Sequence, residues 1–202
     1  SRFGFSRALA VAADGHAVAV AGRKILAANA GAPASELHWV RLIEGASGKE
    51  LLAIEHVVPL LDRARLALKG SDYPVAVALS PDGKTLALGG EGAVWLHDAA
   101  SGRELHRIEL TDDVAAGVGF SPDGRLRAIS GSRDFSIRLM DAASGKQRAI
   151  LANPKVLEQS TSIGRTVGGY SKVAFMPDGR RLIATSSRGS LPSNLQGLWN
   201  QN

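Results

Sequence analysis

Cysteine is absent from this chain of 202 residues, and aromatic residues make up only 5% of it. Without thiols the chain cannot form disulfides, thiolate metal sites or a cysteine nucleophile. No apolar run reaches the length of a membrane-spanning helix, so we expect no membrane partner. No signal peptide is visible, which favours a cytoplasmic location. Because the chain begins with Ser1 rather than Met, we expect its natural N-terminus to be missing.

Clusters of one charge are also absent, although the net charge is +5. The longest basic run is the pair Arg180–Arg181, which indicates a mildly basic solvated surface and argues against a nucleic-acid partner. The five histidines have no helical metal-ligand spacing, and we find no phosphate loop or nucleophile elbow. We therefore expect no cofactor, no metal site and no catalytic residue in the body of the chain.

Glycine is abundant, and much of it lies in a motif that repeats along the chain. The motif reads "AADG" (12–15), "SPDG" (80–83), "SPDG" (121–124) and "MPDG" (176–179). Apolar residues alternate on both sides of it, as in "VAVALSPDGKTLALGG" (75–90), which predicts a β-hairpin. Asp can bond the backbone two residues on, and Gly accepts a positive φ. The structural residues expected in these turns are Asp82, Gly83, Asp123, Gly124, Asp178 and Gly179.

A second motif lies out of phase with the first. It reads "EGASGKELLAI" (44–54), "DAASGRELHRI" (98–108) and "DAASGKQRAIL" (141–151), and each copy follows a strand-like run. Each unit therefore holds four short strands, a to d, with Asp-Gly between a and b and Ser-Gly between c and d. The period is 41 residues from Asp82 to Asp123 and 43 from Asp98 to Asp141. Four strands in about 40–45 residues are typical of a propeller blade.

The stretch "FSPDGRLRAISGSRDFSIRLMDAASGK" (120–146) resembles a blade of the WD40-repeat β-propellers. Met140 stands where that family often has its signature Trp, and Asp141 stands for the signature Asp. The resemblance implies that Asp134 anchors the b–c turn. The fold class expected is all-β, an incomplete β-propeller of about 3.5–4 four-stranded WD40-like blades. Function is then expected to be a non-enzymatic protein-interaction scaffold.

Counting the units places blade one at about 8–56, blade two at 74–110, blade three at 114–151 and the start of blade four at 172–186. An open array leaves blade faces and strand edges bare. We expect missing blades from the rest of the chain, or self-association, to cover them.

Meander topology predicts which end of the blades binds a partner. The a–b and c–d turns share one end, and the b–c and d–a connections share the other. The long segments, at about 22–37, 56–73, 152–171 and 187–195, all fall at the second end, which we expect to bind a protein partner. The side chains predicted to contact it are Arg63, Arg65, Arg165 and Tyr170.

The tail at 187–202 leaves two alternatives open. "GLWN" (197–200) aligns with the c strands of earlier units, so the tail can be the last blade strand. The segment "SSRGSLPSNLQGLWNQN" (186–202) also resembles a motif of the α-L-fucosidases of glycoside hydrolase family 95. That resemblance implies a fragment of a carbohydrate-active enzyme, in which Asn200 and Asn202 orient the hydrolytic water. The carboxylates that such chemistry needs would lie further along the chain.

Overall fold

The described residues form thirteen antiparallel strands and no helix. The structure is a computed structural model of the whole chain, and it describes residues 5–26, 35–59, 76–131, 136–152 and 170–186. The strands are β1 (Phe5–Val11), β2 (Ala17–Leu26), β3 (Ser35–Glu44), β4 (Glu50–Pro59), β5 (Ala76–Leu79), β6 (Thr85–Gly89), β7 (Glu91–Asp98), β8 (Glu104–Phe120), β9 (Leu126–Gly131), β10 (Ser136–Asp141), β11 (Gln147–Ala152), β12 (Tyr170–Phe175) and β13 (Leu182–Ser186).

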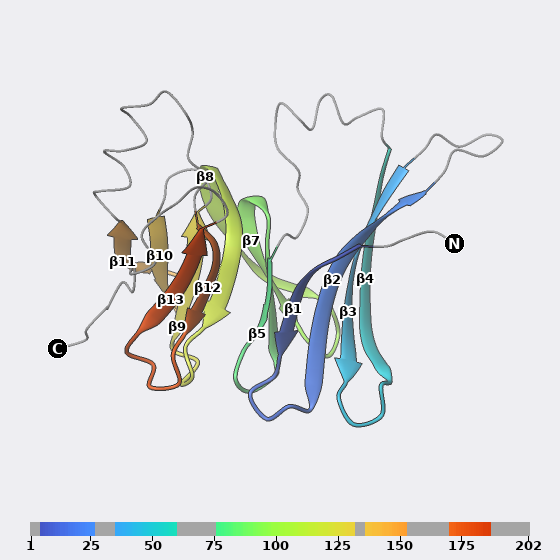
Figure 1. Cartoon of the computed structure of the whole chain (residues 1–202), viewed down its shortest axis with the longest axis horizontal. Helices are drawn as coiled ribbons and strands as arrows, with labels where there is room; N and C mark the ends of the chain where they lie inside the picture. The colour runs from blue at the N-terminus through green and yellow to red at the C-terminus, as the bar shows by residue number, and fades with distance from the viewer. Residues whose placement is uncertain (1–4, 27–34, 60–75, 132–135, 153–169, 187–202) are drawn as a thin grey trace.

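Within each sheet, every strand pairs with its neighbours in the chain, and the strands group into blades that stand side by side (Figure 1). Blade one is the four-stranded sheet β1-β2-β3-β4. Blades two and three share one seven-stranded sheet, because the long strand β8 is the outer strand of blade two and the inner strand of blade three. Blade four is represented by β12 and β13. The all-β propeller-blade architecture expected from the sequence is therefore present.

Three boundaries differ from those expected. Strand β2 continues to Leu26 and pairs with β3 from Ser35, so the b–c connection of blade one is shorter than 22–37. Strand β4 likewise continues to Pro59, whose missing N–H is tolerated at the end of an outer strand. Between blades two and three the strand β8 continues past Asp113, although its pairing with β7 shifts register between Glu109 and Val114. Backbone ladders depend little on side-chain type, which is why these extensions left no sequence pattern.

The hydrophobic core lies between blades and not within one of them. Strand β5 illustrates this, because all four of its residues are buried. Val77 and Leu79 join a cluster with blade one, whereas Ala76 and Ala78 join a cluster with blade three. Successive side chains of a strand point to opposite faces, so a blade between two others is apolar on both.

Large side chains on one blade pack against small ones on the next. Blade one contributes mostly alanines to this interface, and blade two contributes mostly valine and leucine. The buried residues from blade one are Ala8, Ala12, Ala17, Ala19, Ala21, Val40 and Leu42, and those from blade two are Val77, Leu79, Leu86, Leu88 and Ala99. At the junction of blades three and four, Gly117 lets the backbones approach closely. A Cβ there would lie 2.9 Å from both Lys172 Cα and Val173 N.

Candidate functional site

The a–b turns share one hydrogen-bonding arrangement. In blade two, Asp82 Oδ1 accepts bonds from Ser80 Oγ at 2.6 Å and from the Lys84 backbone N–H at 3.1 Å. Gly83 follows with φ 68°, which a residue with a Cβ rarely adopts. The Ser80 hydroxyl, and after it the Lys84 N–H, hold the pKa of Asp82 below its ordinary value. Bonds from the N–H two residues on are also accepted by Asp14, Asp123 and Asp178.

The c–d turns use a different arrangement with the same effect. Asp141 Oδ1 accepts bonds at 2.8 Å from both the N–H and the hydroxyl of Ser144. Its Oδ2 accepts bonds from Arg148 Nη2 at 2.6 Å and Nε at 3.2 Å. The Ser144 N–H, and then the Arg148 guanidinium, lower the pKa of Asp141 strongly. In blade two, Asp98 is bonded in the same way by Ser101.

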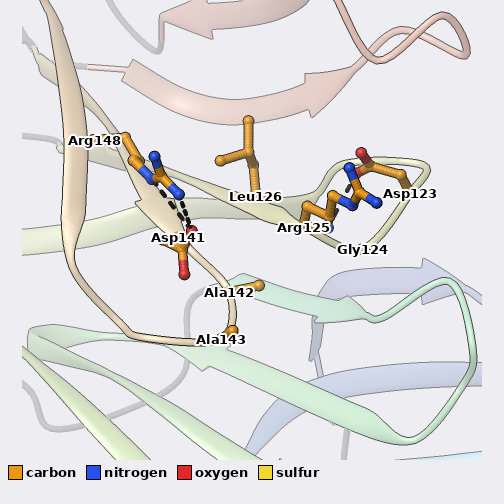
Figure 2. Close-up of a pocket in the computed structure, with 8 residues that line it drawn as sticks. All are labelled: Asp123, Gly124, Arg125, Leu126, Asp141, Ala142, Ala143 and Arg148. Atoms are coloured by element: carbon orange, nitrogen blue, oxygen red, sulfur yellow. Dashed lines mark hydrogen bonds and ion pairs between the residues drawn. The ribbon is translucent and has the colours of Figure 1, made fainter.

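A pocket of about 530 Å³ opens at the turn end of blade three (Figure 2). It lies between the a–b turn that follows Ser121 and the c–d turn that joins β10 to β11. Its lining combines two cations, two carboxylates and small apolar groups: Asp123, Gly124, Arg125, Leu126, Asp141, Ala142, Ala143 and Arg148.

Hydrogen-bond donors exceed free acceptors in this pocket. Both oxygens of Asp141 are already bonded, as is the Asp123 oxygen that accepts from Ser121 Oγ at 2.6 Å. The guanidinium of Arg125 makes no hydrogen bond or ion pair to any described residue, although its backbone N–H bonds Asp123. The exposed Arg125 guanidinium is therefore the group of this pocket that is open to an anionic ligand, with Asp123 as its nearest electrostatic competitor.

One partly buried and one buried cation lie near the boundary of blades two and three. Arg138 Nη1 lies 3.1 Å from Asp113 Oδ2, and Asp113 is only 2% exposed. This ion pair joins strand c of blade three to the long strand β8, and the sequence analysis missed it. Arg127 is 7% exposed, with its Cζ 5.8 Å from the ring centroid of Phe120 and one Nη bonded to the carbonyl of Ala142. Burial lowers the pKa of Arg127.

Three of the four predicted partner contacts, Arg63, Arg65 and Arg165, lie outside the described residues. The turn residue Asp134 and the tail residues Asn200 and Asn202 also lie outside them. Tyr170 differs from the expectation, because it begins β12 and pairs with Ser186 instead of lying in a connection. The ladder continues there past a bulge, which the polar sequence before Tyr170 did not indicate.

Clusters of three or more residues able to hold a metal ion do not occur in the described part of the chain. His97 instead lies with its Nδ1 2.9 Å from the carbonyl oxygen of Gly102, inside its own blade. Among the residues that the structure describes, no helix is long and apolar enough to cross a membrane.

Comparison with known proteins gives the family of these blades. A family profile described as "WD domain, G-beta repeat" matches residues 106–141. An uncharacterized WD repeat-containing protein of Synechocystis sp. is 29% identical over 107 residues, which cover 53% of this chain and 27% of that relative.

Solved structures show the same fold. The RRP9 WD40 repeats match 84% of this chain and 41% of that structure, with 19% identity and a TM-score of 0.53. A Kuenenia stuttgartiensis hydrazine synthase chain matches 92% of this chain and 43% of its own length, with 18% identity and a TM-score of 0.60. The chain thus spans less than half the length of these proteins. It carries WD40 repeats and has the blade architecture of a WD40 β-propeller.

Proposed function

We propose that this chain is a non-enzymatic protein-interaction scaffold that binds its partner at the end carrying the b–c and d–a connections. WD40 propeller repeats are generally used for protein binding, and this supports the general part of the proposal. The choice of end is supported by topology. The Asp-Gly and Ser-Gly hairpin turns occupy one end of the blades (Figure 1). The longest gaps between strands, at 60–75 and 153–169, begin and end at the other, although β6 and β7 are separated there by Gly90 alone.

The observation that carries the proposal is where each strand ends. Strand β4 ends at Pro59 and β5 begins at Ala76, while β11 ends at Ala152 and β12 begins at Tyr170. These four strand ends lie opposite the Asp-Gly turns, because the intervening strands are antiparallel. Connections between elements of compact domains are usually short, and longer ones are commonly binding segments.

The chemistry of the described carboxylates supports a non-enzymatic role. General acid–base work needs a carboxylate with room to take or give a proton near substrate. Here the aspartates of the turns accept bonds from neighbouring serines and backbone N–H groups, which stabilise their charged form and lower the pKa of Asp82 and Asp123. They are used as structural acceptors.

The test is partner capture by the whole chain and by a loop variant. Residues 154–168 are replaced by a short Gly-Ser linker, which leaves β11 and β12 intact. The control substitutes Lys49 and Lys84 by Ser, because both are exposed at the turn end. We expect the linker variant to lose a partner that the control retains, with unchanged circular dichroism. If the linker variant still captures the partner and the control does not, the partner binds at the turn end, which contradicts this proposal.

The predicted contact residues provide a finer test of the same surface. Arg63→Ala, Arg65→Ala, Arg165→Ala and Tyr170→Ala are each compared with the parent chain for binding of the captured partner. We expect at least one substitution to weaken binding by about tenfold, as for a binding hot spot.

A further inference from the structure

The outer edge of blade three differs from the outer edges of blades one and two. Strand β11 pairs with β10 on one side and ends the sheet, so within the described residues its other edge has no strand beside it. Such an edge presents unpaired N–H and C=O groups that can pair with another chain.

Charged residues and proline normally discourage such pairing. Strand β4 carries Glu50 and Glu55 and ends at Pro59, and the outer part of β8 reads "ELHRIEL" (104–110). Strand β11 reads "QRAILA" (147–152), with Arg148 as its one charged residue. Ile150 in this strand is 52% exposed. Of the three described outer strands, β11 is therefore the one best suited to pairing.

The donor-rich pocket lies where β11 begins. Arg148 extends from this strand to the pocket, and Arg125 reaches the same pocket from the a–b turn (Figure 2). Lys146, exposed and just before the strand, adds a third cation. Asp141 is itself ion-paired with Arg148, and Asp123 accepts a hydrogen bond from Ser121 of its own turn, so Arg125 is the cation of the lining most open to an added acidic group.

We propose that β11 and this pocket together bind an extended acidic segment of a partner protein. The segment adds a strand to the free edge of β11 through backbone hydrogen bonds, the known mode of β-augmentation. An Asp or Glu of the segment enters the pocket and accepts bonds from Arg125 and from the outward N–H groups of Arg148. An apolar side chain of the segment covers Ile150. This site is at the turn end, and the inference does not depend on the partner surface proposed above.

The test uses a fluorescein-labelled octapeptide of β-branched residues with one central Glu. A twin carries Gln in place of Glu, and a second twin is N-methylated at alternate amides, which blocks strand pairing. Binding to the whole chain is followed by fluorescence anisotropy. We expect the Glu peptide to bind at least about tenfold more tightly than either twin, because each twin loses one of the two kinds of contact.

Protein variants identify the pocket. Arg125→Ser should weaken the Glu peptide about tenfold and leave the Gln twin unchanged. The matched control is Lys84→Ser, because Lys84 occupies the same place in the a–b turn of blade two; it should change neither affinity. Backbone chemical shifts should move at Ala149–Ala152 and at Arg125.

Several outcomes would overturn the proposal. Equal affinity for the Glu and Gln peptides would show that no carboxylate binds in the pocket. Equal affinity for the Glu peptide and its N-methylated twin would show that the peptide does not pair with β11. Full displacement of the peptide by inorganic phosphate would identify a small-anion site instead. Absence of any anisotropy change with the Glu peptide rejects it outright. The linker variant at 154–168 should bind the peptide normally, so failure of either proposal is recognised separately.

Discussion

Gly117 should be the least replaceable glycine at the junction of blades three and four. It lies in β8, and a Cβ at this position would be 2.6 Å from Ser130 Oγ, 2.9 Å from Lys172 Cα and 2.9 Å from Val173 N. The hydroxyl of Ser130 can rotate, but the other two atoms belong to the backbone of β12. Gly117→Ala therefore forces the two inner strands apart.

The expected cost follows from two opposing effects. Overpacking of a closely packed core costs typically about 1–3 kcal/mol, and contact with a backbone favours the upper half of that range. Replacing Gly by Ala restricts the unfolded chain and returns about 0.4–1 kcal/mol. The net loss in the free energy of unfolding should be about 1–2.5 kcal/mol.

Urea unfolding followed by circular dichroism measures this loss. Gly119→Ala is the matched control, because it lies in the same strand and its nearest atom, Val173 O, is 3.2 Å from the added Cβ. That variant should change the free energy of unfolding by less than about 0.5 kcal/mol. A Gly117→Ala protein as stable as the parent, or less affected than Gly119→Ala, would refute the close approach of blades three and four.

Three further variants test the charges and the open face. Arg127→Leu should raise the free energy of unfolding by about 1 kcal/mol or more in the same assay, because it removes a buried cation where blade two carries Leu86; a loss of stability would contradict this. The lowered pKa of Asp141 means that its stabilisation is present above the unfolded-state pKa of about 3.9 and is lost as pH falls through the folded-state pKa. The free energy of unfolding of Asp141→Asn should therefore fall less than that of the parent between neutral pH and about pH 3, as measured by urea unfolding. An identical pH profile would show that Asp141 is not the origin of this pH dependence. Leu9 and Val11, 65% and 55% exposed on the face of blade one away from blade two, should promote self-association. Leu9→Ser with Val11→Ser should lower the sedimentation coefficient at high concentration, and no change would mean that this face stays free.

Local features of the blades were predictable because they depend on neighbours in the chain. An Asx turn needs an aspartate two residues before the N–H that it accepts, so Asp82 and Asp123 could be assigned from "SPDG" alone. Alternation in 75–90 likewise predicted the hairpin of β5 and β6, but it did not indicate that both faces of these strands are buried, because the second face is covered by a neighbouring blade.

Contacts between distant segments were not predictable in this way. Nothing local marks Asp113 as the partner of Arg138, which lies 25 residues later, and "TDD" (111–113) suggested a connection where β8 is continuous. The pocket also went unrecognised, because it joins two turns that look like ordinary structural turns when each is taken alone.

The sequence by itself determined the repeat, the turn chemistry and the four-stranded blade, since each is encoded within about forty residues. Tertiary structure alone decided how large faces meet small ones, which backbones approach at Gly117, and which cations gather beside β11. These features arise from the stacking of blades and the meeting of separate turns. Stacking is a relation between repeats that no single repeat contains.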